Sequence, residues 1–184
     1  MKRFLPLFLL LVLLGPLAAQ EYSADAARRI DDFFVRIARR SPKTIFLKKL
    51  VVSEADFDSY LNLIYIKRYA PEVSRIHLSM RDKNEIAGEM TALLRGKKYD
   101  AVPAPFRDIR VRFSGRVECS SYRMRFQFAD LEINGTRIAP ELVDEAFGLA
   151  QVRFRVKRSL FDWFNLLPGL KQVETTAGRI TLFY

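Results

Sequence analysis

Few side chains in this sequence have the chemistry of a catalytic centre. The chain of 184 residues holds one histidine, His77, and one cysteine, Cys119. A serine or cysteine nucleophile needs a base beside it, and histidine is the usual base. No Gly-x-Ser-x-Gly sequence accompanies His77. We therefore assign no catalytic residue, and we expect His77 to be an exposed strand residue and Cys119 a small buried apolar one.

Metal and cofactor sites also find little support. One histidine and one cysteine cannot form a Cys/His zinc site, so a metal ion would depend on carboxylates. The sequence contains neither a P-loop nor a Gly-x-Gly-x-x-Gly pattern. We expect no cofactor and no metal, while a hydrolase that uses two carboxylates stays open as an alternative. The candidate acidic pairs, which helix starts and solvated helix faces also explain, are Asp31-Asp32, Asp56 with Asp58, and Asp144-Glu145.

The N-terminus has the layout of a secretory signal peptide. Two basic residues precede the apolar run from Phe4 to Leu14, and small residues follow at Ala18-Ala19. The run has about half of the ~20 residues that a membrane-spanning helix needs. We expect a signal peptide over 1–19 and a single domain over 20–184, exported to the periplasm or cell envelope. An uncleaved N-terminal membrane anchor is the alternative, and export makes nucleic acid a poor partner.

Two helices are predicted in the first half of the domain. Residues 23–40 place apolar side chains at helical spacing and charged ones on the other faces. Residues 54–70 follow a capping serine, Ser53, and end at Pro71. This second helix is apolar on nearly all sides, so other elements must bury it.

Alternating apolar and charged residues predict antiparallel strands over 73–80, 85–94, 109–119 and 122–128. A phase shift at Ala129-Asp130 indicates a bulge, and Asn134-Gly135 predicts a hairpin turn. We also expect a short strand over 44–52, a C-terminal hairpin over 171–184, and short helices over 140–147 and 160–167. Residues 149–157 fit either a strand or a helix.

The fold class that these elements predict is α+β. We expect a curved antiparallel sheet packed around the central helix, with an N-terminal helix and short C-terminal helices. The predicted inward side chains are Ile76, Leu78, Met80, Val111, Phe113, Val117, Met124, Phe126 and Phe128.

A stripe of arginines lies on the outward side of two of the predicted strands. Its members are Arg110, Arg112, Arg116, Arg123 and Arg125. With a formal net charge of +10, such a stripe favours anionic partners such as a membrane surface. A solvated outer sheet face explains the same pattern.

Several short segments together carry a resemblance to known proteins. They are 53–61, 113–117, 126–128, 131–135, 138–140, 167–170 and 178–180. In them the chain resembles a loose group of exported or membrane-anchored bacterial proteins of unknown function, which look distantly like the tubular lipid-binding modules. The resemblance implies a fold and an envelope location, and it implies lipid binding only by analogy of fold.

The function that we expect is non-enzymatic binding of a lipid or similar amphiphile in an apolar groove. Its predicted lining is Tyr60, Ile64, Phe113, Met124, Phe126, Trp163 and Phe164. The main alternative is a structural or adaptor protein with a filled core that binds anionic surfaces through the arginine stripe. A carboxylate-based hydrolase is the second alternative.

Overall fold

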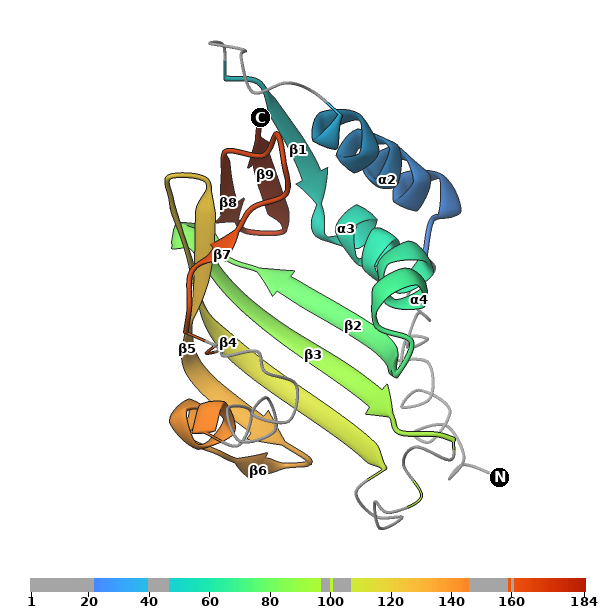
Figure 1. The fold of residues 1–184 in the computed structure, drawn as a ribbon, viewed down its shortest axis with the longest axis vertical. Helices are drawn as coiled ribbons and strands as arrows, with labels where there is room; N and C mark the ends of the chain where they lie inside the picture. The colour runs from blue at the N-terminus through green and yellow to red at the C-terminus, as the bar shows by residue number, and fades with distance from the viewer. Residues whose placement is uncertain (1–21, 40–46, 97–99, 101–106, 146–158, 160) are drawn as a thin grey trace, which may run out of the picture.

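The fold is α+β, as predicted, and contains two antiparallel sheets, an N-terminal helix and a central helix (Figure 1). The computed structural model describes residues 22–39, 47–96, 100, 107–145, 159 and 161–184. The predicted signal peptide and residues 149–157 lie outside these ranges. None of the helices described is long and apolar enough to cross a membrane.

The N-terminal helix, α2 (Ala24–Ala38), is amphipathic as predicted. The Oγ atom of Ser23 caps it by accepting a hydrogen bond from the backbone N–H of Ala26 at 3.2 Å. Its buried face packs against the central helix and the core. The buried side chains are Ala26, Ala27, Ile30, Phe33 and Ile37.

The central helix comprises α3 (Glu54–Tyr60), a π-helical turn η1 (Leu61–Tyr65) and α4 (Ile66–Tyr69). The predicted N-cap is confirmed, because the backbone N–H of Asp56 donates to Ser53 Oγ at 3.1 Å. The helix stops before Pro71, which cannot continue it. Both predicted helices in the first half of the domain are therefore present.

The larger sheet has six strands in the order β2-β3-β4-β5-β6, with a short strand β7 paired to β5. Its elements are β2 (Val73–Met80), the turn η2 (Asp82–Asn84), β3 (Glu85–Leu93), β4 (Asp108–Ser120), β5 (Arg123–Ile133), β6 (Thr136–Arg137) and β7 (Phe164–Asn165). Alternation holds along each long strand, so apolar side chains share one face and charged ones the other.

The smaller sheet has the order β1-β9-β8 and contains the predicted C-terminal hairpin. Its strands are β1 (Lys49–Ser53), β8 (Gln172–Thr176) and β9 (Arg179–Phe183). Side chains from this sheet, from both helices and from one end of the larger sheet form the core. The core includes Phe33, Ile37, Val52, Leu61, Met80, Val173, Ile180 and Leu182.

Two local predictions in the larger sheet are confirmed. Ala129 has no partner where the β4–β5 register shifts between Ser114 and Gly115, which is the expected bulge. Asn134 and Gly135 have φ of 51° and 83° between paired strands, which is the left-handed pair that a two-residue hairpin turn requires.

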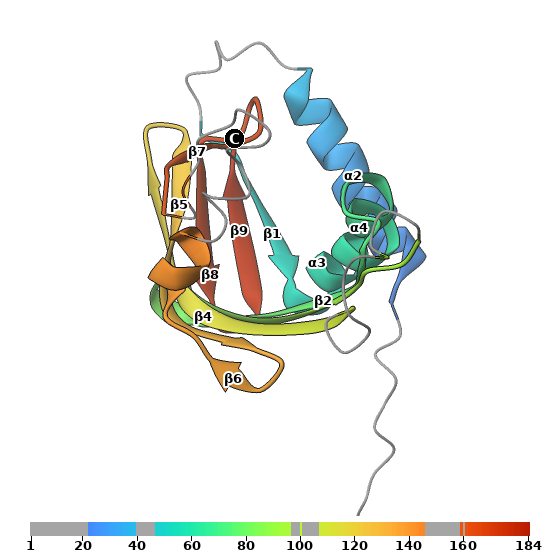
Figure 2. The same ribbon diagram turned by 60° about the horizontal axis from the view of Figure 1, so that its bottom comes forward.

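The predicted wrapping of the central helix is not observed. Within the described ranges no sheet curls around this helix, which lies along the edge of the larger sheet beside β2 (Figures 1 and 2). The helix α2 covers another side of the central helix, and β1 and β9 contact the first turns of the central helix, in α3. Three separate elements, rather than one curved sheet, therefore bury its apolar surface.

The predicted helix over 160–167 is wrong. Ser159 and Asp162 do form the hydrogen bond of a capped start, from Ser159 N–H to Asp162 Oδ2 at 2.8 Å. The chain then turns into β7, because Phe164-Asn165 pairs with the edge of β5. Apolar residues in so short a run fit a helix or a strand equally well, and the open edge of β5 decides between them.

Elsewhere, residues 140–145 are helical and β1 begins at Lys49.

Candidate functional site

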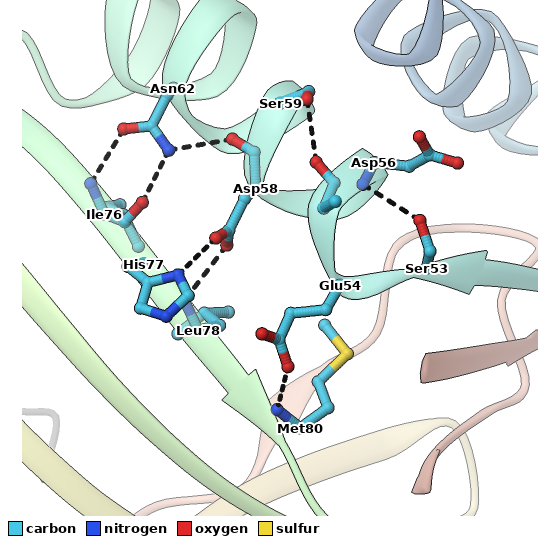
Figure 3. Close-up of polar contacts among 11 residues, drawn as sticks. Ser53, Glu54, Asp56, Asp58, Ser59, Asn62, Ile76, His77, Leu78 and Met80 are labelled. Atoms are coloured by element: carbon cyan, nitrogen blue, oxygen red, sulfur yellow. Dashed lines mark hydrogen bonds and ion pairs between the residues drawn. The ribbon is translucent and has the colours of Figure 1, made fainter. Parts of the chain in front are cut away.

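A row of polar side chains joins the central helix to the edge strand β2 (Figure 3). Glu54, Asp58 and Asn62 are spaced four residues apart, so they lie on one face of the helix. Their side-chain oxygens accept backbone N–H groups that alternate along β2. The pairs are Glu54 Oε2 with Met80 N at 2.8 Å, Asp58 Oδ1 with Leu78 N at 3.0 Å, and Asn62 Oδ1 with Ile76 N at 2.9 Å. We call these residues the polar seam.

The polar seam can form because side chains on one helix face and backbone N–H groups on one side of a strand recur at nearly the same spacing. Four helical residues advance about 6 Å, and two strand residues advance about 6.6 Å. The π-helical turn of η1 begins at Leu61, next to Asn62, whose Nδ2 also donates to the carbonyl oxygens of Ile76 and Asp58 at 2.6 and 2.8 Å. The helix thus takes the place of a neighbouring strand and closes an edge that could otherwise pair with another chain.

Asp58 also holds the single histidine of the chain. Its Oδ2 lies 2.5 Å from Nδ1 of His77, and the Asp58 side chain is fully buried whereas that of His77 is 40 % exposed. A carboxylate and the imidazole that it orients are two of the three members of a hydrolase triad. Among the described residues, however, no hydroxyl or thiol is hydrogen-bonded to His77. The geometry supplies an oriented, solvent-accessible base without a nucleophile beside it.

Strand register places apolar side chains in rows across the inner face of the larger sheet. One row, which we call the apolar row, consists of Ile76, Met90, Val111 and Ile133, all half-buried. The next row contains Leu78, Gly88, Phe113 and Leu131. The ring of Phe113 meets the ring of Phe126, two rows further along the sheet, edge to face, with centroids 5.6 Å apart at 89°.

The ring of Phe113 reaches over the neighbouring strand at a glycine, Gly88. A Cβ atom at Gly88 would be only 2.5 Å from Cζ of Phe113, which faces it across the β3–β4 ladder. The missing side chain is therefore space that the aromatic ring occupies.

The structure brings four of the seven predicted groove residues to this face. Phe113, Met124 and Phe126 alternate on its strands, and Phe164 lies opposite Met124 in the β5–β7 ladder. Met124 also packs against the core. Phe113 and Phe126 are half-buried; Phe113 lies in the row next to the apolar row, and Phe126, which pairs with Val117, contacts the ring of Phe113.

The other three predicted groove residues lie elsewhere. Ile64 packs against the core from the central helix, and Tyr60 lies between the helices with its ring 5.3 Å from that of Phe34. Burial, with a smaller contribution from the charge of Asp31, raises the pKa of Tyr60 to about 12. Trp163 lies on the opposite side of β5, where its ring is 4.8 Å from the Arg125 guanidinium.

Carboxylates accompany most of the predicted arginine stripe. Register places Glu89 and Glu132 on either side of Arg112, at 3.2 and 3.3 Å. The hydrogen bond to Glu89 is the main cause of the raised pKa of Arg112. The remaining ion pairs are Arg110 with Glu89 at 3.5 Å, Arg116 with Glu85 at 3.4 Å, and Arg125 with Glu118 at 2.7 Å. The outer face is therefore a ladder of matched charges as much as a basic patch.

Arg123, the last member of the stripe, differs from the others. The described residues place no carboxylate within ion-pair distance of it, and its guanidinium instead lies 5.9 Å from the centroid of the Trp163 ring. Its positive charge is thus directed toward an aromatic surface near the end of β5.

Cys119 lies on the apolar side of its strand, as the sequence predicts, but it is only partly buried. Cys119 is half-buried against the core, and its Sγ donates to the carbonyl oxygen of Val173 at 3.5 Å. Burial raises the pKa of its thiol, which lowers the thiolate fraction near neutral pH.

A metal ion would find few ligands in the described parts of the chain. No three histidine, cysteine, aspartate or glutamate side chains come together there in a group that could hold one. The two arrangements with functional potential are therefore the Asp58–His77 pair and the apolar face.

No family model matches the chain, and no curated protein is similar to it.

Proposed function

We propose that the protein is a non-enzymatic protein of the bacterial cell envelope that binds a lipid or similar amphiphile on the apolar face of its larger sheet. The observation that carries this proposal is the half-buried apolar row, together with Phe113 in the next row and the ring of Phe126 that Phe113 contacts. In this proposal the Asp58–His77 pair serves the polar seam rather than a reaction.

The position of the apolar row supports a ligand site. The helices and the smaller sheet cover the end of the face that carries Met80 and Val117, and both of these side chains are buried. Met90, Val111 and Ile133 lie toward the other end of the same strands and are not part of that core as far as the structure describes it. An acyl chain laid along them would gain about 0.8 kcal/mol for each methylene group buried.

The charged opposite face supports an orientation for the bound molecule. Each strand that contributes to the apolar row carries ionic side chains on its other face, Glu89 and Arg112 among them. An amphiphile can therefore place its chain on one face, with its headgroup at the rim where solvent and charged residues are within reach.

The proposal is tested by making the apolar row polar. We expect the double variant Met90→Gln/Val111→Asn to bind a dansyl-labelled undecanoic acid at least about ten-fold more weakly than the unaltered protein, a loss of roughly 1.4 kcal/mol. Fluorescence titration of the probe measures this change. Both substitutions keep the approximate side-chain size, so thermal unfolding should stay cooperative.

A matched control lies one residue away on each strand. The double variant Thr91→Gln/Arg110→Gln places the same amide groups on the opposite face of β3 and β4, where the two residues face one another. It should bind the probe as the unaltered protein does. Equal probe affinities for the apolar-row variant and the unaltered protein would refute this site.

A further inference from the structure

Exposed aromatic and apolar side chains gather at the end of the larger sheet where β4 turns into β5. The short strand β7 lies beside this end of β5 (Figures 1 and 2). Tyr122 is 59 % exposed in the turn, Leu167 is 49 % exposed, and Phe164 in β7 is 36 % exposed. The backbone joins the two segments, because the N–H of Leu166 donates to the carbonyl oxygen of Tyr122 at 2.9 Å. With Arg123 and Trp163, the exposed residues Tyr122, Phe164 and Leu167 form what we call the hairpin tip.

Tyr122 occupies an unfavourable backbone conformation. Ser121 and Tyr122 have φ of 49° and 64°, a left-handed pair like that of Asn134-Gly135 in the β5–β6 turn. Asparagine and glycine suit such a turn, whereas a bulky side chain rarely adopts it. Glycine at this position would make the turn more stable than tyrosine does. The presence of a tyrosine therefore indicates a role for its side chain other than stabilising the fold.

The charges around the hairpin tip leave Arg123 available to a ligand. Arg125 is paired with Glu118 at 2.7 Å, and Asp162 accepts the backbone N–H of Ser159 at 2.8 Å. Arg123 and Asp162 line one shallow hollow with Trp163, but the ion pairs of the described residues include none between them. A guanidinium held over an indole ring can still donate to a phosphate.

We propose that the hairpin tip docks on the surface of a phospholipid bilayer. Tyr122, Phe164 and Leu167 would enter the interfacial region, and Arg123 would bind a lipid phosphate. Tyrosine and tryptophan prefer this boundary because their rings are apolar and their polar groups stay hydrated. The net charge of +10 favours anionic bilayers in addition.

A bilayer fits this surface better than a protein partner does. The tip is the turn of a hairpin, and its apolar side chains come from that turn, from β7 and from the segment after β7 rather than from one flat face. The inference goes beyond the proposed function, because the apolar row and the hairpin tip share no residue. Either can therefore fail while the other holds.

The sole tryptophan of the chain makes the inference directly measurable, because Trp163 lies in the hairpin tip. We expect its fluorescence to shift to shorter wavelength when the purified protein meets phosphatidylglycerol/phosphatidylethanolamine vesicles in low salt. Brominated acyl chains in the same vesicles should quench it. Pure phosphatidylcholine vesicles should give a weaker shift, since they offer phosphates without net charge.

Variants then separate docking from folding. We expect Tyr122→Gly/Leu167→Ser to lower the vesicle partition coefficient about ten-fold or more, because two apolar side chains leave the interface. Its thermal unfolding midpoint should be unchanged or higher, since glycine relieves the backbone of the turn. The control is Tyr69→Ser, which removes a tyrosine of similar exposure, 62 %, from α4.

The two sites have separate readouts. The tip variant should still bind the dansyl-labelled fatty acid, and the apolar-row variant should still partition onto vesicles. Vesicle binding that is absent in the unaltered protein, or that is the same in the tip variant, would overturn the docking inference. Capture of a protein through the tip without any vesicle binding would likewise overturn it.

Discussion

Replacing Asp58 with alanine should lower the free energy of unfolding by about 3–5 kcal/mol. The carboxylate is fully buried and bonds both Nδ1 of His77 and the backbone N–H of Leu78. Alanine would leave that N–H without its partner at the edge of β2 and would detach the central helix from the sheet at its midpoint. Urea denaturation followed by circular dichroism measures the change.

Two related variants serve as comparisons for Asp58→Ala. Asp58→Asn keeps an oxygen that can accept the N–H of Leu78, so we expect it to retain part of the lost stability. Asp56→Ala removes a neighbouring carboxylate that is partly exposed and lies 3.6 Å from Arg29, a contact worth at most about 1 kcal/mol. If Asp58→Ala were no more harmful than Asp56→Ala, the polar seam would not be what joins helix and sheet.

Gly115→Ala is expected to have the second largest effect, a loss of about 3 kcal/mol. A Cβ at this position would be 2.1 Å from the carbonyl oxygen of Gln127 and 2.8 Å from the ring of Phe126. The nearest atom belongs to the backbone of β5 and cannot move without opening the ladder beside the bulge. Thermal or urea unfolding of the variant measures the loss.

Gly135→Ala is the matched control for Gly115→Ala. Gly135 has φ of +83° and open space around it, so its substitution strains only the turn, by about 1 kcal/mol. A loss at Gly115 no larger than that at Gly135 would mean that β4 and β5 do not approach as closely as the bulge register requires.

Local features of the fold could be predicted because neighbouring residues encode them. Ser53 and Pro71 mark where the central helix begins and ends, and Asn134-Gly135 specifies its own turn. The phase shift at Ala129 predicted the bulge, because the alternation of residue types along one strand shows which face of the sheet each side chain occupies. None of these predictions depends on knowing which strands are neighbours.

The arrangement of the site could not be predicted, because it depends on long-range pairing. Glu54, Asp58 and Asn62 carry a readable signal, a polar stripe at four-residue spacing in an otherwise apolar helix. Which strand edge receives that stripe is set by the whole fold, and so His77 gains a partner 19 positions away. Read alone, the same strand pattern suggested only an exposed histidine.

The partners of the arginine stripe could not be predicted either, because they come from neighbouring strands. Arg112 looks unmatched along its own strand, yet the register of β3 and β5 supplies Glu89 and Glu132 beside it. Charges that accumulate along one strand can be neutralised across the sheet, and only the register reveals this. Arg123, at the hairpin tip, is the member of the stripe that has no such carboxylate partner among the described residues and lies beside Trp163 instead.

Amphiphile binding can be tested by native mass spectrometry of the protein purified without detergent from its own host. We expect a second species, heavier than the chain by the mass of one lipid or fatty acid, that is lost from Met90→Gln/Val111→Asn and retained by Thr91→Gln/Arg110→Gln. A spectrum with only the bare chain, or an adduct that the apolar-row variant retains unchanged, would contradict it.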